Sequence, residues 1–364
     1  MNEKTSHLRD RGTVPVPISI LDQLPMGALR TATESLRAST ALAVLADRSG
    51  FHRYWVAEHH SSAAAASSSP SIVLAHLAAH TTRIRLGSGG IMLPNYAPLL
   101  VAEQFGTLAA LAPGRIDLGV GRAFGTDKMT AAALRRDGRP QEGNDFPQQI
   151  SELIGFLHTG FAHDHPYANI YAVPGLLHNE AARHVPGADE SAAWQPPPIW
   201  ILGSTPTSAR LAGSLGLPYS YAAHIAPAEI EASLNAYRST FVPSPWLAQP
   251  YVSISVNAFA AEQEREAMGE LLTGALTQLR TRTGWNGFIP SVAEARRFSL
   301  SPDDRNVIAH ALKHSVYGTA DDVKTGLLEL VKRTDADELL LAAFTHCPEA
   351  RLHSYELIAH AYDS

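Results

Sequence analysis

Two adjacent histidines, His59 and His60, follow a short apolar segment and are the residues of this chain best suited to proton transfer. Imidazole changes its charge near neutral pH, so histidine serves as a general acid or base. Because successive side chains of a strand point to opposite faces, only one of the two can face a given cavity. Position alone does not choose between them, and the second histidine then bonds to backbone.

Residues 203–208 (GSTPTS) join a predicted strand to a predicted helix and carry several hydroxyl groups. A helix start presents free N–H groups and partial positive charge, and Ser204, Thr205 and Ser208 add donors, which together suit a phosphate. Arg122 ends another predicted strand and supplies a cation. The same hydroxyl residues also fit plain helix capping. The loop is not a Walker motif, and no dinucleotide-binding glycine fingerprint follows any strand.

Gly89 and Gly90 lie in the middle of a predicted strand, where glycine weakens a sheet. One interpretation is a bulge that lets a flat ring lie against the backbone. The other is close packing of a helix on the strand. The sequence leaves both open.

The segments that position these residues alternate between strand-like apolar runs and helical periodicity about eight times. This order predicts an α/β fold, a (β/α)8 TIM barrel in one domain covering residues 1–364, with its reactive groups at the carboxyl ends of the strands. We expect insertions after strand 4 and after strand 7. The predicted strands are 14–22, 53–58, 84–93, 116–122, 199–203, 218–224, 251–260 and 338–345.

Two segments without clear periodicity interrupt this alternation. Residues 161–198 are rich in His, Pro and Gly, and we expect them to form an insertion that covers the pocket. Residues 283–301 hold three turn-forming residues and are predicted to be a mobile lid. The aromatic residues of the two covers favour a bulky or aromatic substrate, such as a secondary metabolite; they are Tyr167, Tyr171, Trp194, Trp285 and Phe288.

Composition narrows the function classes. The chain is 45% hydrophobic and 18% charged, which is ordinary for a globular protein, and its formal net charge is -6. No basic stripe points to nucleic acid. Cys347 is the one cysteine, which excludes an internal disulfide. The polar residues 1–12 show no signal-peptide core, and no apolar run has the length of a membrane span, so we expect a cytoplasmic protein.

Five stretches of the chain resemble the bacterial luciferase-like monooxygenase family, whose members are flavin-dependent (β/α)8 barrels. They agree with the family in order and spacing over nearly the whole chain. The stretches are YWVAEHH at 54–60, IRLGSGGIMLP at 84–94, LAPGRIDLGVGR at 111–122, PIWILGSTPTSARLAGSLGLP at 198–218 and VYGTADDV at 316–323.

The resemblance implies roles for individual residues. His59 matches the catalytic histidine of the family, and His60 is its neighbour, which we assign to cofactor binding. The Gly89–Gly90 pair matches a cis peptide against the flavin ring. The group that holds the FMN phosphate matches Arg122, Ser204, Thr205 and Ser208. No metal is expected.

The same resemblance predicts an oxygenase that uses reduced FMN and molecular oxygen, through a flavin 4a-hydroperoxide, to oxygenate an organic substrate. A separate flavin reductase would supply the FMN, because the chain has no nicotinamide-binding motif. Gly121 stands where true luciferases carry a reactive cysteine, so light emission is not expected. A homodimer through the small-residue helix at 71–80 is also expected.

Three alternatives stay open. A deazaflavin coenzyme serves hydride transfer in the same barrel class. Some family relatives bind flavin without catalysis. A metal-dependent hydrolase barrel would use His59, His60 and His224, although such barrels usually show an H-x-H pair after the first strand, whereas Leu21, Asp22 and Gln23 stand there.

Overall fold

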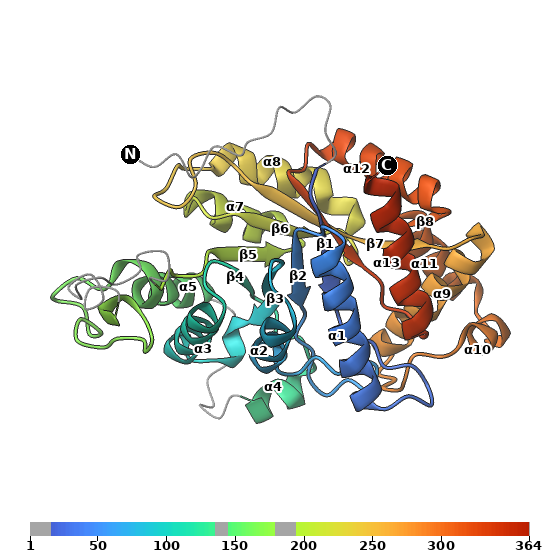
Figure 1. The fold of residues 1–364 in the computed structure, drawn as a ribbon, viewed down its shortest axis with the longest axis horizontal. Helices are drawn as coiled ribbons and strands as arrows, with labels where there is room; N and C mark the ends of the chain where they lie inside the picture. The colour runs from blue at the N-terminus through green and yellow to red at the C-terminus, as the bar shows by residue number, and fades with distance from the viewer. Residues whose placement is uncertain (1–15, 135–144, 179–193, 364) are drawn as a thin grey trace.

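Eight parallel strands close into a ring in the computed structural model, which describes residues 16–134, 145–178 and 194–363. Figure 1 shows helices packed around the outside of these strands. Along the ring the order is β6-β5-β4-β3-β2-β1-β9-β7, and pairing of β6 with β7 completes it. The predicted (β/α)8 TIM barrel is thus confirmed. The strands are β1 (Ile18–Asp22), β2 (Arg53–Val56), β3 (Arg85–Met92), β4 (Ile116–Gly121), β5 (Ile199–Gly203), β6 (Tyr219–Ala222), β7 (Val252–Ala260), β8 (Val316–Gly318) and β9 (Glu338–Ala342).

The helices follow the strands as their apolar periodicity predicts. Four begin with a serine or threonine whose hydroxyl accepts a bond from a backbone N–H, paired with an acidic residue three positions later. The helices are α1 (Ala32–Arg48), α2 (Pro70–His80), α3 (Pro98–Leu111), α4 (Lys128–Leu134), α5 (Phe146–Ile154), α7 (Pro206–Ser214), α8 (Ile230–Thr240), α9 (Glu264–Arg282), α10 (Val292–Arg297), α11 (Pro302–Lys313), α12 (Ala320–Thr334) and α13 (Pro348–Asp363).

Among the strands and α-helices of the described residues, three short ones were not predicted: helix α4, strand β8, and helix α10, which lies inside the predicted lid at 283–301. Helix α4 has only seven residues, too few for a clear helical period. Strand β8 has three residues and pairs only with the far end of β7, outside the ring. All three are too short for sequence periodicity to detect.

The apolar core has two parts. The larger part lies between the strands and the surrounding helices. A smaller part joins strands that are not neighbours, since Trp55 of β2 meets Trp200 of β5 edge to face with ring centroids 5.1 Å apart. These side chains therefore fill the inside of the barrel, as is usual for barrels of this size.

A buried ionic network closes the end of the barrel where the strands begin. Arg53 donates to Asp117 at 2.7 Å and to Glu338 at 2.9 Å, and Arg85 donates to Asp117 at 2.5 Å. Burial alone would raise the pKa of Asp117, but the two guanidinium groups lower it to about 2. The charged side chains at this end of the barrel therefore pair with one another and stabilise the fold, which is the usual role of this end in such barrels.

The insertion at 161–198 does not cover the barrel mouth with the residues that the structure describes, so that expectation is wrong for them. Tyr167 packs on Phe156 and Phe161, and the Trp194 indole donates to the Gly106 carbonyl of α3 at 2.9 Å. Their aromatic surface is therefore buried on the outside of the barrel. Residues 179–193 of the predicted cover lie outside the described residues, as do residues 1–12.

The predicted lid at 283–301 lies against the loops that follow β1 and β2. Asn286 donates to the Ser61 carbonyl at 2.7 Å, and its own side-chain oxygen accepts from the Ala63 N–H at 2.8 Å. The backbone N–H of Ala28 donates to the Ile289 carbonyl at 2.7 Å. The segment thus lies over the ends of β1 and β2, and its motion stays a prediction.

In the part of the chain that the structure describes, we find no helix that is long and apolar enough to cross a lipid bilayer.

Candidate active site

One cavity opens at the carboxyl ends of the strands and holds about 1100 Å³ of empty space, its mouth included. This size suits a cofactor with a small substrate beside it. Seven of the eight predicted site residues line it, from the ends of β2, β3, β4 and β5 and the start of α7. They are His59, Gly89, Gly90, Arg122, Ser204, Thr205 and Ser208.

His59 is held by a buried serine at one ring nitrogen. Its Nδ1 lies 3.1 Å from the Ser67 hydroxyl, and its backbone N–H donates to the Ser67 carbonyl at 3.0 Å. Its Nε2 has no hydrogen-bond partner among the described residues and is left for the cavity. Burial and the neighbouring His60 lower the pKa of His59 to about 4, so the ring is neutral at pH 7. A neutral imidazole with one free nitrogen can accept or share a proton there.

His60 does not reach the cavity, which corrects its predicted place beside the cofactor. Its Nε2 pairs with buried Glu58 at 2.8 Å, and its N–H donates to the Gly125 carbonyl at 3.3 Å. Glu58 also accepts from the Met92 N–H at 3.1 Å. The polar partners on the outer side thus turn His60 away and connect the loops that carry His59 and Arg122.

His224, which follows β6, is a second histidine in the cavity. Its Nδ1 lies 2.8 Å from the Ser255 hydroxyl, which itself donates to the Tyr221 carbonyl at 3.2 Å. Since a hydroxyl has one proton to donate, Nδ1 of His224 must be the donor, and its Nε2 carries the lone pair. Burial lowers the pKa of His224 to about 4. Its position at a strand end was visible in the sequence, but its pairing with β7 was not.

The start of α7 forms a cradle of free donors. Thr205 occupies the N-cap without a side-chain cap, and Pro206 follows it at the first helical position. Ser208 donates its hydroxyl proton to the Thr205 carbonyl at 2.9 Å, so this hydroxyl must rotate before it can donate to an anion. A Cβ at Gly203 would stand 1.9 Å from the Ser208 hydroxyl oxygen, so glycine is needed for the close turn.

Arg122 has no hydrogen-bond or ion-pair partner within the described residues. Uncapped N–H groups beside a free guanidinium suit an anion such as phosphate.

The Gly89–Gly90 peptide is cis and forms part of the cavity wall. The pairing of β3 with β4 shifts register here, which is a bulge. Neither glycine has room for a side chain, because a Cβ would stand 2.5 Å from Leu21 at Gly89 and 2.8 Å from the Gly119 carbonyl at Gly90. The predicted bulge is therefore present, whereas the alternative, a helix packed closely on the strand, is wrong, because the nearest neighbours of both glycines belong to other strands. Bare backbone here leaves a flat apolar ring room to approach.

Other strand-end residues serve the fold. Asp22 is buried outside the cavity, where its carboxylate accepts from Arg351 at 2.6 Å. Thr345 and His346 do not line the cavity, and none of the five predicted substrate-facing aromatics does. Within the described residues, no group of three His, Cys, Asp or Glu side chains gathers that could hold a metal.

The lowered histidine pKa values predict that stability falls in acid. Burial lowers the pKa of His59, His158 and His224 to about 4, from an ordinary value of 6.5. Between these values the unfolded chain binds protons that the folded chain does not, so unfolding becomes easier as pH falls from 6.5 towards 4. The His224→Gln variant should show a smaller loss than wild type in urea unfolding at pH 7 and 4.5. An equal loss in both proteins contradicts the assignment. Burial raises the pKa of Glu270 to about 7, so this residue makes the folded state more stable as pH falls. The effect is the same in wild type and in His224→Gln, so it does not change their comparison.

Comparison with known proteins shows the family to which the chain belongs. The model of the luciferase-like monooxygenase family matches residues 17–337. A luciferase-like monooxygenase of Escherichia coli K12 is 39% identical over 344 residues, covering 94% of this chain and 96% of its own. The crystal structure of apo-MsnO8 is 34% identical and superposes with a TM-score of 0.81, covering 96% of this chain and 99% of that one. The oxygenating constituent of 3,6-diketocamphane monooxygenase of Pseudomonas putida, solved with FMN, shares the fold at 19% identity, a TM-score of 0.68 and coverage of 96% and 98%. The chain therefore belongs to the luciferase-like monooxygenase family.

Proposed function

We propose that this protein is a flavin-dependent monooxygenase that binds reduced FMN in the cavity at the strand ends and oxygenates a small organic substrate. One observation supports it above the others: a single cavity brings together His59, the Gly89–Gly90 wall and the anion cradle at α7. A second histidine, His224, lines the same space. Such convergence of one polar end, one apolar wall and neutral imidazoles is what a flavin enzyme of this barrel class needs.

The described residues fit FMN at both of its ends. Arg122, Ser204, Thr205 and Ser208 would hold the phosphate, because they combine a free guanidinium with hydroxyls and unfilled N–H groups. The opposite wall is apolar and would exclude water from the ring; it includes Leu21, Trp55, Ala57, Leu202 and Leu340. When bound, reduced FMN would supply the electrons that activate oxygen.

The protein's own contribution to the reaction is proton handling in a dry site. His59 would hold or move a proton at Nε2, with Ser67 fixing its ring. His224 would accept a proton at Nε2, since its Nδ1 proton is already engaged with Ser255. The apolar wall would keep water out of the site, because water there would open side reactions that waste the reduced cofactor.

Arg122→Ala should weaken FMN binding about 10-fold to 100-fold, because a charge-assisted hydrogen bond to phosphate is lost. Fluorescence titration with FMN and anaerobic titration with reduced FMN measure this. Arg210→Ala, which removes an exposed arginine from α7 itself, is the matched control and should bind as wild type does. Unchanged affinity in Arg122→Ala would remove the phosphate site from the proposal.

The same titration separates the alternatives. A protein that binds a reduced deazaflavin but not reduced FMN would be a hydride-transfer enzyme. Binding of reduced FMN with no oxygen consumption in the presence of any substrate would favour a flavin carrier.

We also propose that a separate flavin reductase supplies the FMN. We further propose a homodimer through α2, on which the Ile72 side chain is 71% exposed.

A further inference from the structure

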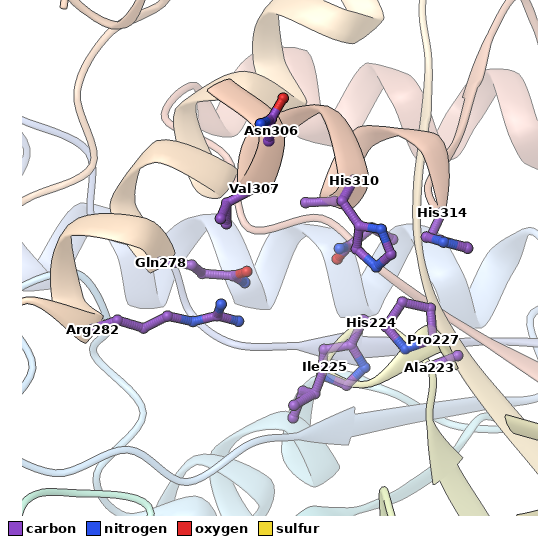
Figure 2. A pocket seen from close by; sticks show the side chains of 12 residues that line it. Ala223, His224, Ile225, Pro227, Gln278, Arg282, Asn306, Val307, His310 and His314 are labelled. Carbon is purple, nitrogen blue, oxygen red and sulfur yellow. The ribbon is translucent and has the colours of Figure 1, made fainter. Parts of the chain in front are cut away.

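A second cavity lies beside the first and shares His224 and Ile225 with it. It holds about 810 Å³ between the loop after β6, strand β7 and the helices α9 and α11 (Figure 2). We call it the α9–α11 cleft. The residues that line it include His224 and Ile225 after β6, Gln278 and Arg282 of α9, and Val307 and His310 of α11.

One wall of the α9–α11 cleft is polar and cationic. Figure 2 shows the side chains of Arg282 and Gln278 reaching from α9 into the space below α11. Arg282 has no ion-pair or hydrogen-bond partner within the described residues, and no Asp or Glu is among the residues that line the cleft. The imidazoles of His310 and His314 contact each other edge to face, with centroids 4.5 Å apart, and both line the same cleft. A guanidinium without a carboxylate nearby is a binding group for an anion.

Apolar side chains that face solvent also line the α9–α11 cleft. Ile225, which is 62% exposed, and Pro227 come from the loop after β6, and Val307, which is 39% exposed, comes from α11 (Figure 2). Exposed aliphatic side chains opposite an unpaired cation form a surface for an amphipathic molecule. A purely polar ligand would leave these side chains in water, and a purely apolar one would leave the guanidinium unused.

The α9–α11 cleft and the flavin cavity are adjacent, because His224 and Ile225 line both. A molecule held at Arg282 and lying along Ile225 would reach His224, which also lines the cavity that holds His59. The cleft thus places an anion-binding group beside the proposed reaction site.

We propose that the α9–α11 cleft is the substrate-recognition subsite, and that it takes small organic monocarboxylic acids with an apolar body. The carboxylate pairs with Arg282, the body lies on Ile225 and Val307, and the far end enters the flavin cavity at His224. As a statement about substrate class this rests on the proposed function, but the binding preference itself does not require flavin.

The test compares acids with their uncharged primary amides. Calorimetric titrations use the purified full-length protein and three pairs with the same body: hexanoate with hexanamide, benzoate with benzamide, and 3-phenylpropanoate with 3-phenylpropanamide. We expect at least one acid to bind about tenfold more tightly than its amide, because only the acid forms a charge-assisted hydrogen bond. The Arg282→Gln variant should reduce that preference to less than about twofold, and Arg282→Lys should retain part of it.

Arg265→Gln is the matched control, because Arg265 is exposed on α9 but does not line the cleft. It should keep the wild-type preference. If no acid binds more tightly than its amide, or if Arg282→Gln keeps the preference, the α9–α11 cleft is not an acid site. FMN titration of the same samples separates the two proposals: FMN binding with no acid preference overturns only the cleft, whereas acid preference without FMN binding supports the cleft and overturns the flavin proposal.

Discussion

The His59→Gln variant should form product roughly 10²-fold to 10⁴-fold more slowly than wild type, while FMN affinity changes little. Proton transfer by a positioned side chain contributes about this much to a rate. Glutamine keeps a polar group of similar size near Ser67, so the cavity should keep its shape. The measurement is substrate-dependent product formation with reduced FMN supplied, together with an FMN titration of the same protein.

The adjacent His60→Gln variant makes this test specific. His60 is bonded to Glu58 outside the cavity, so its replacement should cost far less than that of His59. Ser67→Ala should have an intermediate effect, because it releases the His59 ring without removing it. If His60→Gln lowers the rate as much as His59→Gln does, the catalytic assignment of His59 is wrong.

Replacing Arg351 with methionine should lower the free energy of unfolding by about 3–5 kcal/mol. Arg351 of α13 donates to Asp22 at 2.6 Å, and both side chains are buried. Burial by itself raises the pKa of the Asp22 carboxyl, and Arg351, with hydrogen bonds from Ser39 and Tyr54, holds it below its ordinary value. Without Arg351 the carboxylate keeps its desolvation cost and loses its main compensation.

Chemical denaturation of Arg351→Met and Arg30→Met measures this effect with a surface control. Arg30 pairs with Glu349 at 3.0 Å on the surface, where such a pair contributes about 0–1 kcal/mol. The Asp22→Asn, Arg351→Met double variant should recover part of the loss, because no charge is left buried. Equal losses in the two single variants would show that the buried pair is not important for stability.

The sequence alone was enough to predict the barrel. Each ring strand is a mostly apolar run of four to nine residues, as expected for strands covered on both faces. Because every such run alternates with a helical period, few topologies are compatible with the chain. The predicted ends of the ring strands differ from the observed ends by at most four residues, and β8 was missed because it pairs only at the edge of β7. Local periodicity therefore determines the type and order of the elements but not how far each pairing extends.

The residues of the anion cradle were also readable, since a glycine, two hydroxyl residues and a proline at a helix start are adjacent in sequence. The choice between His59 and His60 was not readable from position. It depends on Ser67 and Glu58, which engage one ring each, and on the Gly125 carbonyl that holds His60 outside. Ser67 and Glu58 are near in sequence, but which histidine each engages depends on how the loop after β2 folds against Met92 and Gly125, which belong to other segments.

What the sequence by itself determined is the set of strand ends and the kinds of side chain placed on them. What only the tertiary structure decided is which of those side chains share a space: His59 and His224 do, whereas Asp22 and His60 point elsewhere. The physical reason is that apolar periodicity is a property of a single segment. The direction of a polar side chain is set by hydrogen-bond partners and burial that distant segments supply, and these exist only after the ring has closed.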